Sequence, residues 1–591
     1  MRNNISLVII ATLGFTQLTV AGVKPLSTKA EQTGFEETGR YVEVEQLCHQ
    51  FEKAYPKQVR CFAFGKSANG IPMWAMAVNS DGVLTAQQAK ANQLPVTLFQ
   101  GGIHAGEIDG KDAGFLVLRE LLQKPGKDNP LNKQVMLFVP VFNVDGHERF
   151  AAYNRPNQRG PKEMGWRTTA QNFNLNRDYA KADTPEMQAM LAMVNAWDPL
   201  FYVDLHVTDG AKFQHDVSVQ VEPILSGDAN LQKIGSQFQS AVLSDLKKSG
   251  SMPLPYYPSF IEGDNPASGF ADSVSMPRFS TGYFQLRNRF GVLVETHSWK
   301  TYPVRVNATA NSIRAMLKQV ASNGTAWQAV AMAADQRSEA IAGKPVTLTY
   351  QTDKTFTMID FQGYAYTRSL STVSGASMTR YDESKPEVWK LPLYASVSPN
   401  LIVNAPLAGY IVPPAFADFV EARLNTHGIV SKRLTTAQAN TAVEQFQTQS
   451  AEFAAQSFES HQALKITGQW QAQETPIAAN SLYVPIAQAK SALVMALLEP
   501  QAPDSYLAWG FFNNEFERKE YMEDYVAEEV AEQMLQDPSI KQEFEQRIQT
   551  DKAFADSPQL RLEFFARKHP SWDSRYQVYP VLRTGVNVNG R

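Results

Sequence analysis

Cysteine is nearly absent from this sequence, because only Cys48 and Cys61 occur among its 591 residues. Cys48 lies in a helix-like run and Cys61 in the strand-like run that follows it. One local disulfide and two buried thiols both fit, since spacing along a chain does not fix a distance in space. A cysteine nucleophile is the least favoured use.

The sequence also lacks a strong imbalance of charge. Lys and Arg number 55 against 59 Asp and Glu, which gives a formal net charge of -4, and no dense basic patch occurs. We therefore expect no nucleic-acid partner. A hydrophobic content of 43% and a charged content of 19% are typical of a globular protein, and the length predicts two or three domains.

No segment after the N-terminus is long and apolar enough to cross a bilayer. Residues 1–22 have an Arg at the start, an apolar stretch and small residues around Ala21, which is the outline of a secretory signal peptide. An uncleaved membrane anchor is the alternative, but the apolar run is shorter than the roughly 20 residues that a span needs. The sequence thus predicts a secreted or periplasmic protein without a membrane span after cleavage.

Short apolar runs alternate with amphipathic runs between residues 41 and 318. Examples are "PVTLFQGG", "QVMLFVPVFN", "PLFYVDLH" and "FGVLVETH". This alternation predicts an α/β domain with a largely buried sheet, and its polar residues of interest fall at the strand ends. Residues 319–343 read as a helical connector. Residues 344–591 read as an accessory α+β region of unknown role.

His104 and Glu107 follow one apolar run, and a turn between a strand and a helix could aim both side chains at one point. A catalytic zinc takes three protein ligands and keeps one position open. His206, at the end of the strand-like "FYVDLH", fits as the third ligand. The spacing alone is weak evidence, because an ordinary polar turn would look the same.

Five separated motifs strengthen this interpretation: "GGIHAGEIDG", "FNVDGHE", "GWRTTAQNFNLNRDY", "DLHVTDG" and "FGVLVETHSW". In this order they resemble the zinc metallocarboxypeptidases of the carboxypeptidase A type, the M14 peptidases. The resemblance covers about residues 42–318. It implies a mixed eight-stranded sheet flanked by helices and one Zn²⁺ per chain, held by His104, Glu107 and His206.

The resemblance also assigns catalytic and substrate-binding roles. Glu295 corresponds to the family's general base, which acts on the zinc-activated water. Arg167 corresponds to the arginine that stabilises the oxyanion, and Asn176 with Arg177 to the pair that binds the terminal carboxylate of the substrate. The alternatives are an ion pair of Glu295 with Arg287 or Arg289, and surface ion pairs for the arginines.

Three features depart from the family pattern or are poorly fixed by it. Gly106 stands where the best-studied members have an arginine that helps to hold the substrate. Asn174 replaces an aspartate that orients the first histidine, so that histidine is expected to be less basic. Tyr283 is our choice for the family's mobile, substrate-binding tyrosine, with Tyr256 and Tyr257 behind it.

Other polar residues near the motifs are expected to be structural. Asn143, Asp145 and Gly146 read as turn-forming residues after a strand. His147, His215 and His297 are expected to be hydrogen-bonded neighbours rather than ligands. The loop "FIEGDNPASGFADS" could favour a basic side chain in a specificity pocket, or could be merely solvated.

The sequence therefore predicts an exported zinc metallocarboxypeptidase that hydrolyses peptides with a free C-terminal carboxylate. A cell-wall peptide hydrolase, or an amidohydrolase acting on another amide, is the first alternative. A non-catalytic peptide-binding protein on the same scaffold is the second. Residue specificity and oligomeric state are not predicted.

Overall fold

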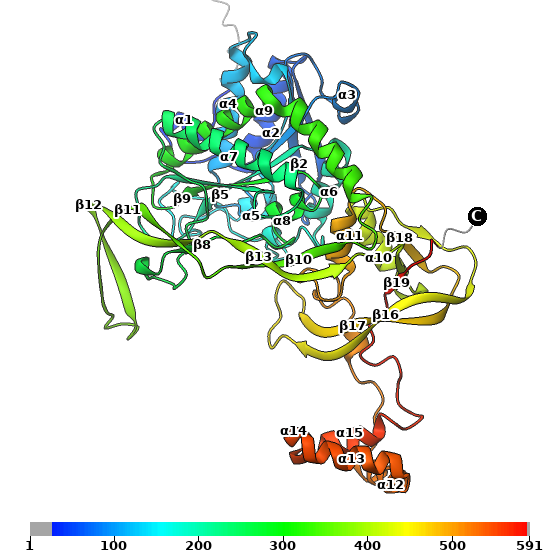
Figure 1. Ribbon diagram of the computed structural model, residues 1–591. Helices are drawn as coiled ribbons and strands as arrows, with labels where there is room; N and C mark the ends of the chain where they lie inside the picture. The colour runs from blue at the N-terminus through cyan, green and yellow to red at the C-terminus, as the bar shows by residue number, and fades with distance from the viewer. Residues whose placement is uncertain (1–25, 588–591) are drawn as a thin grey trace, which may run out of the picture.

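The computed structural model describes residues 26–587 (Figure 1). The predicted signal peptide at residues 1–22 lies outside the described residues. Within them, no helix is long and apolar enough to cross a membrane.

A mixed eight-stranded sheet forms the centre of the N-terminal half, as predicted. Its strand order is β1-β2-β4-β3-β5-β9-β6-β7, with β4, β3, β5 and β9 parallel. The strands are β1 (Val59–Lys66), β2 (Pro72–Val78), β3 (Val96–Gly101), β4 (Val135–Val139), β5 (Phe201–Thr208), β6 (Val217–Glu222), β7 (Pro253–Leu254) and β9 (Phe290–His297). Every residue of β3, β4 and β5 is buried, which explains their almost uninterrupted apolar runs.

Helices cover both faces of this sheet (Figure 1). One face packs against α2 (Tyr41–Ala54), α4 (Asp109–Gln123), α7 (Ala229–Lys248) and α9 (Tyr302–Ser338). The opposite face packs against α3 (Ala86–Ala91), α6 (Pro185–Trp197) and α8 (Ser280–Gln285). Short elements complete this half: α1 (Lys29–Gln32), α5 (Val144–Glu148), β8 (Phe270–Ala271) and the 3₁₀ turns Pro130–Asn132, Leu175–Arg177 and Pro266–Ser268.

Cys48 and Cys61 form a disulfide that joins α2 to β1, with a Cα–Cα distance of 5.4 Å. This settles the choice that the sequence left open between a bridge and two thiols. The bridge ties the first helix of the domain to the edge strand of the sheet.

The predicted connector, residues 319–343, coincides largely with the second half of α9, a single helix of 37 residues. The first half of α9 packs on the sheet through Ile313, Met316 and Leu317. The helix therefore belongs to the N-terminal domain and also leads out of it. Its apolar contacts continue to Trp327 and Ala331, well inside the predicted connector.

The C-terminal half contains three further sheets and several helices. Two small sheets are formed by β10 (Pro345–Thr352) with β13 (Val397–Asn404), and by β11 (Thr357–Leu370) and β12 (Ser377–Tyr394) with β8. The third has six strands, β14 (Gly409–Val412), β15 (Lys432–Arg433), β16 (Gln438–Phe453), β17 (Leu464–Ile477), β18 (Leu482–Pro485) and β19 (Leu582–Thr584). With these strands lie α10 (Pro414–Thr426), α11 (Ser491–Leu498) and the 3₁₀ turn Asn513–Phe516.

The six-stranded sheet shares a hydrophobic core with the second face of the central sheet. Leu98 and Leu137 of the central sheet belong to the same buried cluster as Tyr410, Val484 and Leu497. The C-terminal half is thus built onto the N-terminal domain rather than tethered to it.

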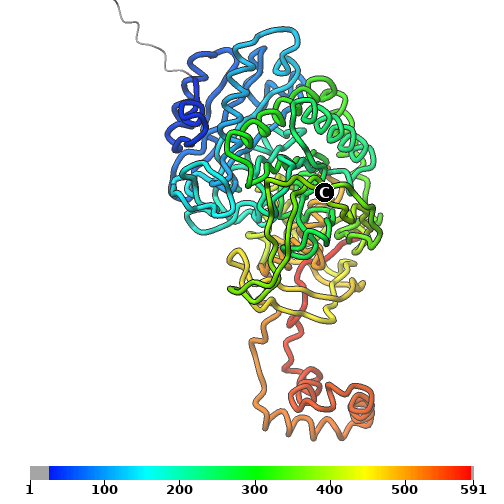
Figure 2. The backbone as a smooth tube through the Cα atoms, turned by 90° about the vertical axis from the view of Figure 1, so that its left-hand side faces the viewer, coloured from blue at the N-terminus to red at the C-terminus, as the bar shows by residue number. Residues whose placement is uncertain are grey.

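A helical lobe stands apart from this shared core. It consists of α12 (Asp524–Met534), α13 (Pro538–Thr550), α14 (Lys552–Asp556) and α15 (Pro558–Ala566). Two extended segments connect it to the rest of the protein (Figure 2). The lobe has a small core of its own, formed by Ala531, Phe554, Phe564 and Phe565.

Candidate functional site: a buried His-Glu-His cluster

The site lies at the carboxyl ends of three neighbouring parallel strands, β3, β5 and β9. His104 and Glu107 lie in the turn between β3 and α4, where the backbone N–H of Glu107 donates to the carbonyl of His104 at 2.8 Å. His206 lies near the end of β5, and its register partner on β9 is Glu295. The alternation of strand side chains therefore directs His206 and Glu295 to the same face of the sheet.

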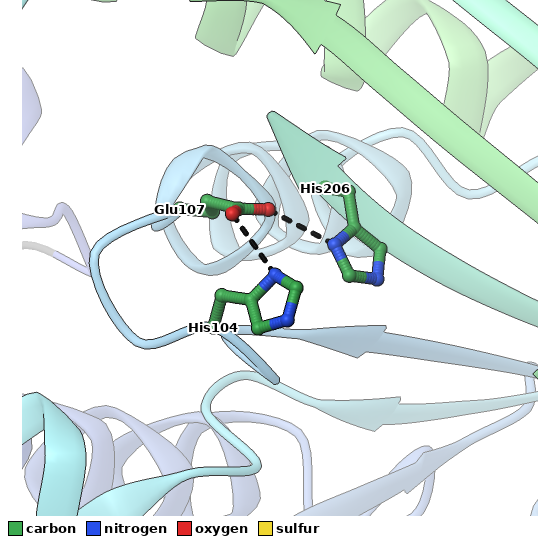
Figure 3. Close-up of side chains that lie close together, drawn as sticks. All are labelled: His104, Glu107 and His206. Carbon is green, nitrogen blue, oxygen red and sulfur yellow. Dashed lines mark hydrogen bonds and ion pairs between the residues drawn. The ribbon is translucent and has the colours of Figure 1, made fainter. Parts of the chain in front are cut away.

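Three side chains converge at this point (Figure 3). The Nδ1 atom of His104 lies 2.9 Å from one carboxylate oxygen of Glu107, and the Nδ1 atom of His206 lies 2.9 Å from the other. Their possible ligand atoms all lie within 4.8 Å of one another, and all three side chains are buried. The structure thus brings together the three residues predicted as zinc ligands.

The outer nitrogens of both imidazoles face oxygen atoms. Nε2 of His104 lies 3.1 Å from Oδ1 of Asn174, and Nε2 of His206 lies 3.0 Å from Oδ1 of Asp204. When the proton of each imidazole is on Nε2, each Nδ1 presents a lone pair to the Glu107 carboxylate. Nε2 of His206 lies at ion-pair distance from Asp204 but has no hydrogen-bond partner among the described residues. Two such lone pairs and a carboxylate form a set that can bind a cation. Two nitrogens and a carboxylate suit Zn²⁺, so the residues fit that metal.

The ionisable groups of the cluster shift one another's pKa values. Burial lowers the pKa of His104 to about 4, although Glu107 opposes this. Burial would also lower the pKa of His206, but Asp204 and Glu107 hold it well above the usual value. Burial disfavours ionisation of Glu107, yet His104 and Arg155 keep its pKa well below normal. The cluster therefore holds its carboxylate in the ionised form that metal binding requires.

Glu295 is buried beside the cluster, with 7% of its surface exposed. Its Oε2 atom has no hydrogen-bond partner among residues 26–587. Burial, reinforced by Glu107, Asp204 and Asp209, raises its pKa to about 8. A bound divalent cation would favour the ionised form and lower that pKa.

Neither arginine that offered Glu295 an alternative partner contacts it. Arg287 donates to the Tyr283 hydroxyl and to Asn195. Arg289 pairs with Asp198 and Asp335. The carboxylate of Glu295 is therefore available to a ligand rather than held in a structural ion pair.

Arg167, predicted to stabilise the oxyanion, and Arg177, predicted to bind the substrate carboxylate, lie at the same site. Arg167 lies 3.5 Å from Oε1 of Glu107, and its side chain is 36% exposed. Arg177 follows Asn176 in the 3₁₀ turn, and its guanidinium lies 4.6 Å from the centre of the Phe279 ring. Burial and the nearby charge of Arg167 lower the pKa of Arg177. Two cations held close together in this way favour an anionic ligand.

Tyr283 is not placed among these residues. It is fully buried in α8, and its hydroxyl lies 2.9 Å from Nδ1 of His427 and 3.2 Å from Arg287. These contacts join the N-terminal domain to the C-terminal half, so Tyr283 has a packing role. Burial, reinforced by the nearby charges of Glu295 and Glu107, raises the pKa of Tyr257, so its phenol is the tyrosine group on which the cluster acts.

The other motif residues have mainly structural contacts. Asn143 accepts a hydrogen bond from the Gly146 backbone and donates to the carbonyl of Arg167, and Asp145 accepts from Ser67. Two of the three histidines have polar partners: His147 contacts Glu148, and His215 contacts the Met252 carbonyl.

The third histidine differs from the expectation. His297 stacks on Phe213 with the ring centres 3.8 Å apart. In the part of the chain that the structure describes, neither of its ring nitrogens has a hydrogen-bond partner. His297 is therefore held by packing rather than by hydrogen bonds.

Sequence reasoning missed Arg155, which occupies the space that a side chain at Gly106 would fill. A Cβ on Gly106 would lie 2.6 Å from Cγ of Arg155 and 2.7 Å from the Gly165 carbonyl oxygen. The guanidinium of Arg155 lies 2.9 Å from Oε1 of Glu107 and 3.3 Å from Asp209. An arginine thus reaches this side of the cluster from another loop, and no motif in the sequence indicates it.

Asp204 was not predicted as a residue of the site, although its spacing from His206 in the sequence could have indicated it. It lies two residues before His206 on β5, so both side chains lie on one face of the strand. It accepts hydrogen bonds from Gln100 and Ser280 and faces Nε2 of His206.

The sequence and structure are similar to those of known carboxypeptidases. Residues 44–270 match the family model described as zinc carboxypeptidase. Carboxypeptidase D of Drosophila melanogaster is 22% identical over 185 residues, which are 28% of this chain and 12% of that protein. The aligned part therefore spans only a small share of that relative.

Solved structures also align with about half of the chain. Bovine thrombin-activatable fibrinolysis inhibitor, in complex with a tick carboxypeptidase inhibitor, is 14% identical with a TM-score of 0.36, covering 49% of this chain and 97% of that one. Carboxypeptidase A of Helicoverpa armigera is 15% identical with a TM-score of 0.36, covering 50% and 75%. A metallo-carboxypeptidase of Burkholderia cenocepacia is 16% identical with a TM-score of 0.34, covering 47% and 69%.

The family match contains His104, Glu107 and His206 and ends before Glu295. It covers the strands and turns that build the metal cluster. Residues 44–270 are thus a domain of the zinc carboxypeptidase family.

Proposed function

We propose that this protein is an exported zinc metallopeptidase that removes a C-terminal residue from peptides. The observation that carries the proposal is the buried cluster of His104, Glu107 and His206, with Glu295 as the register partner of His206. A metal site and a free carboxylate on one face of a sheet are the parts that metal-assisted hydrolysis requires. Export rests on residues 1–22 alone.

His104, Glu107 and His206 would hold the metal. When bound, Zn²⁺ supplies Lewis-acid chemistry, because it lowers the pKa of water and polarises a carbonyl group. Glu295 accepts a proton from the attacking water at its unpartnered Oε2 and then delivers it to the departing amine. An intact ligand set with an available base argues against a purely peptide-binding role.

The arginines position the substrate. Arg167 donates to the carbonyl oxygen as negative charge develops on it. Arg177, with Asn176, binds the terminal carboxylate, since a planar guanidinium can form two parallel hydrogen bonds to it. We assign the substrate-facing phenol to Tyr257 rather than Tyr283, because the charge of Glu295 acts on the Tyr257 phenol while the Tyr283 hydroxyl is bonded to His427.

Mass spectrometry of a peptide library tests this function. The zinc-loaded protein is incubated with linear peptides, with the same peptides carrying C-terminal amides, and with cell-wall stem peptides. We expect loss of one C-terminal residue from free-acid peptides and no loss from the amides. Internal cleavage, or equal cleavage of the amides, would contradict a carboxypeptidase. Cleavage of stem peptides alone would favour the cell-wall alternative.

A further inference from the structure

The hairpin of β16 and β17 brings one carboxylate from the C-terminal half to the catalytic cluster. At its tip the backbones of Phe458 and His461 exchange two hydrogen bonds, of 2.8 and 3.0 Å. Glu459 and Ser460 form the two-residue turn between them. The carboxylate of Glu459 accepts a hydrogen bond from the backbone N–H of Asn174 at 2.9 Å. Asn174 is the residue whose side chain faces His104.

The hairpin tip is anchored on both sides of Glu459. Nε2 of His461 lies 2.7 Å from Asp183, in the segment that follows Arg177. Phe458 stacks against Trp509, and the guanidinium of Arg278 lies over both rings. These contacts fix the position of Glu459 without using its carboxylate.

The turn itself is an unfavourable one for these residues. Glu459 has a φ of 49° and Ser460 a φ of 62°. Turns of this kind strongly prefer Asn-Gly, because side chains with a Cβ are strained at positive φ. Such strain is commonly retained at functional positions.

Glu459 also lies next to the proposed carboxylate-binding arginine. Its negative charge raises the pKa of Arg177 against the effect of burial, and the Asn174 backbone that it binds lies three residues before Arg177. Only Oε2 of Glu459 has a hydrogen-bond partner in the described part of the chain, so Oε1 remains available. A substrate whose carboxylate is bound to Arg177 would therefore also lie beside the negatively charged carboxylate of Glu459.

We propose that Glu459 determines specificity by binding a positively charged group on the C-terminal residue of the substrate. Arg177 binds the carboxylate of that residue, and Glu459 attracts a cation on the same residue, as in a peptide ending in lysine. The C-terminal half then forms part of the substrate site. This inference rests on the proposed function, since it takes the Arg177 end of the site as the place of the substrate's C-terminus.

Calorimetry separates this role from a purely structural one. Two peptides are compared that differ only in a C-terminal lysine or norleucine, which has an uncharged side chain of similar length. Binding is measured to the zinc-loaded Glu295→Gln protein, with and without the further change Glu459→Gln. We expect tighter binding of the lysine peptide, and a fall in the lysine-to-norleucine affinity ratio of about fivefold or more when Glu459 is replaced.

The ratio is the decisive quantity, because a residue that only holds Asn174 in place would weaken both peptides equally. Glu452→Gln is the matched control, since it removes the same charge from an exposed position on the same hairpin. An unchanged ratio in the Glu459 variant, or no binding of either peptide, would overturn the inference. If the ratio falls but the protein with Glu295 intact cleaves neither peptide, the proposed reaction is wrong and the binding role of Glu459 stands.

Discussion

Arg155 and a bound Zn²⁺ would both offset the negative charge of the Glu107 carboxylate. The guanidinium of Arg155 lies 2.9 Å from the buried Glu107 carboxylate. A bound metal would supply that positive charge itself. The importance of Arg155 should therefore depend on whether the site is loaded.

We predict that Arg155→Met destabilises the metal-free protein more than the zinc-loaded protein. Methionine keeps an apolar stem over Gly106 but leaves Glu107 with less compensation, a loss on the order of 3 kcal/mol for a buried charge. The measurement is thermal unfolding with excess chelator and with excess Zn²⁺.

Lys162→Met provides the control for Arg155, because it removes a charge from an exposed side chain nearby. It should lower neither unfolding temperature appreciably. Equal destabilisation of the two forms by Arg155→Met would contradict this shared role.

Single residues differed in how far the sequence could place them. His104, Glu107 and His206 were predictable because each follows an apolar run, and parallel strands end at one edge of a sheet. Tyr283 was misleading, because its hydroxyl pairs with His427, a residue 144 positions later in the chain. Arg155 and Glu459 had no local signal, since their positions depend on how distant loops pack.

At the scale of elements, the helical lobe α12–α15 behaves as an insertion. The chain enters and leaves it at neighbouring points, because the backbone N–H of Gln577 donates to the Glu515 carbonyl at 2.8 Å. The apolar core of the lobe comes entirely from residues 531–565. The lobe should therefore fold independently and contribute little to the stability of the rest of the protein.

We predict that replacing residues 518–575 with a short Gly-Ser linker leaves peptide hydrolysis and the unfolding temperature of the remaining protein unchanged. The excised part contributes no residue to the core shared by the central and six-stranded sheets. Circular dichroism melting and the rate of C-terminal cleavage check this expectation. A marked fall in either would show that the lobe supports the catalytic half.

The sequence predicted elements well where their periodicity was strong. The parallel strands were recognisable because burial on both faces demands continuous apolar residues. The end of α9 within the domain was not recognisable. A helix that packs on one domain and continues beyond it has no break in its pattern of apolar residues. The long strands β11, β12, β16 and β17 are largely exposed, so their pairing follows from hairpin geometry rather than from apolar runs.

Across the protein as a whole, the two halves share one hydrophobic core, and we propose that they also share one substrate site. Leu98 of the central sheet and Val484 of the six-stranded sheet lie in the same cluster. Glu459 of the C-terminal half accepts a hydrogen bond from the backbone of Asn174, whose side chain faces His104 of the cluster. Sequence patterns alone could not reveal this shared core. The residues that form it are far apart in the chain, and each lies in an apolar segment that looks ordinary by itself.

Glu295 is proposed to move the proton at a metal site formed by other residues. The direct test is to measure zinc content by elemental analysis and C-terminal hydrolysis by mass spectrometry in the Glu295→Gln protein. We predict about one zinc per chain, as in the unsubstituted protein, with hydrolysis reduced by roughly a hundredfold to ten-thousandfold. Full hydrolysis by a zinc-loaded Glu295→Gln protein would contradict the account.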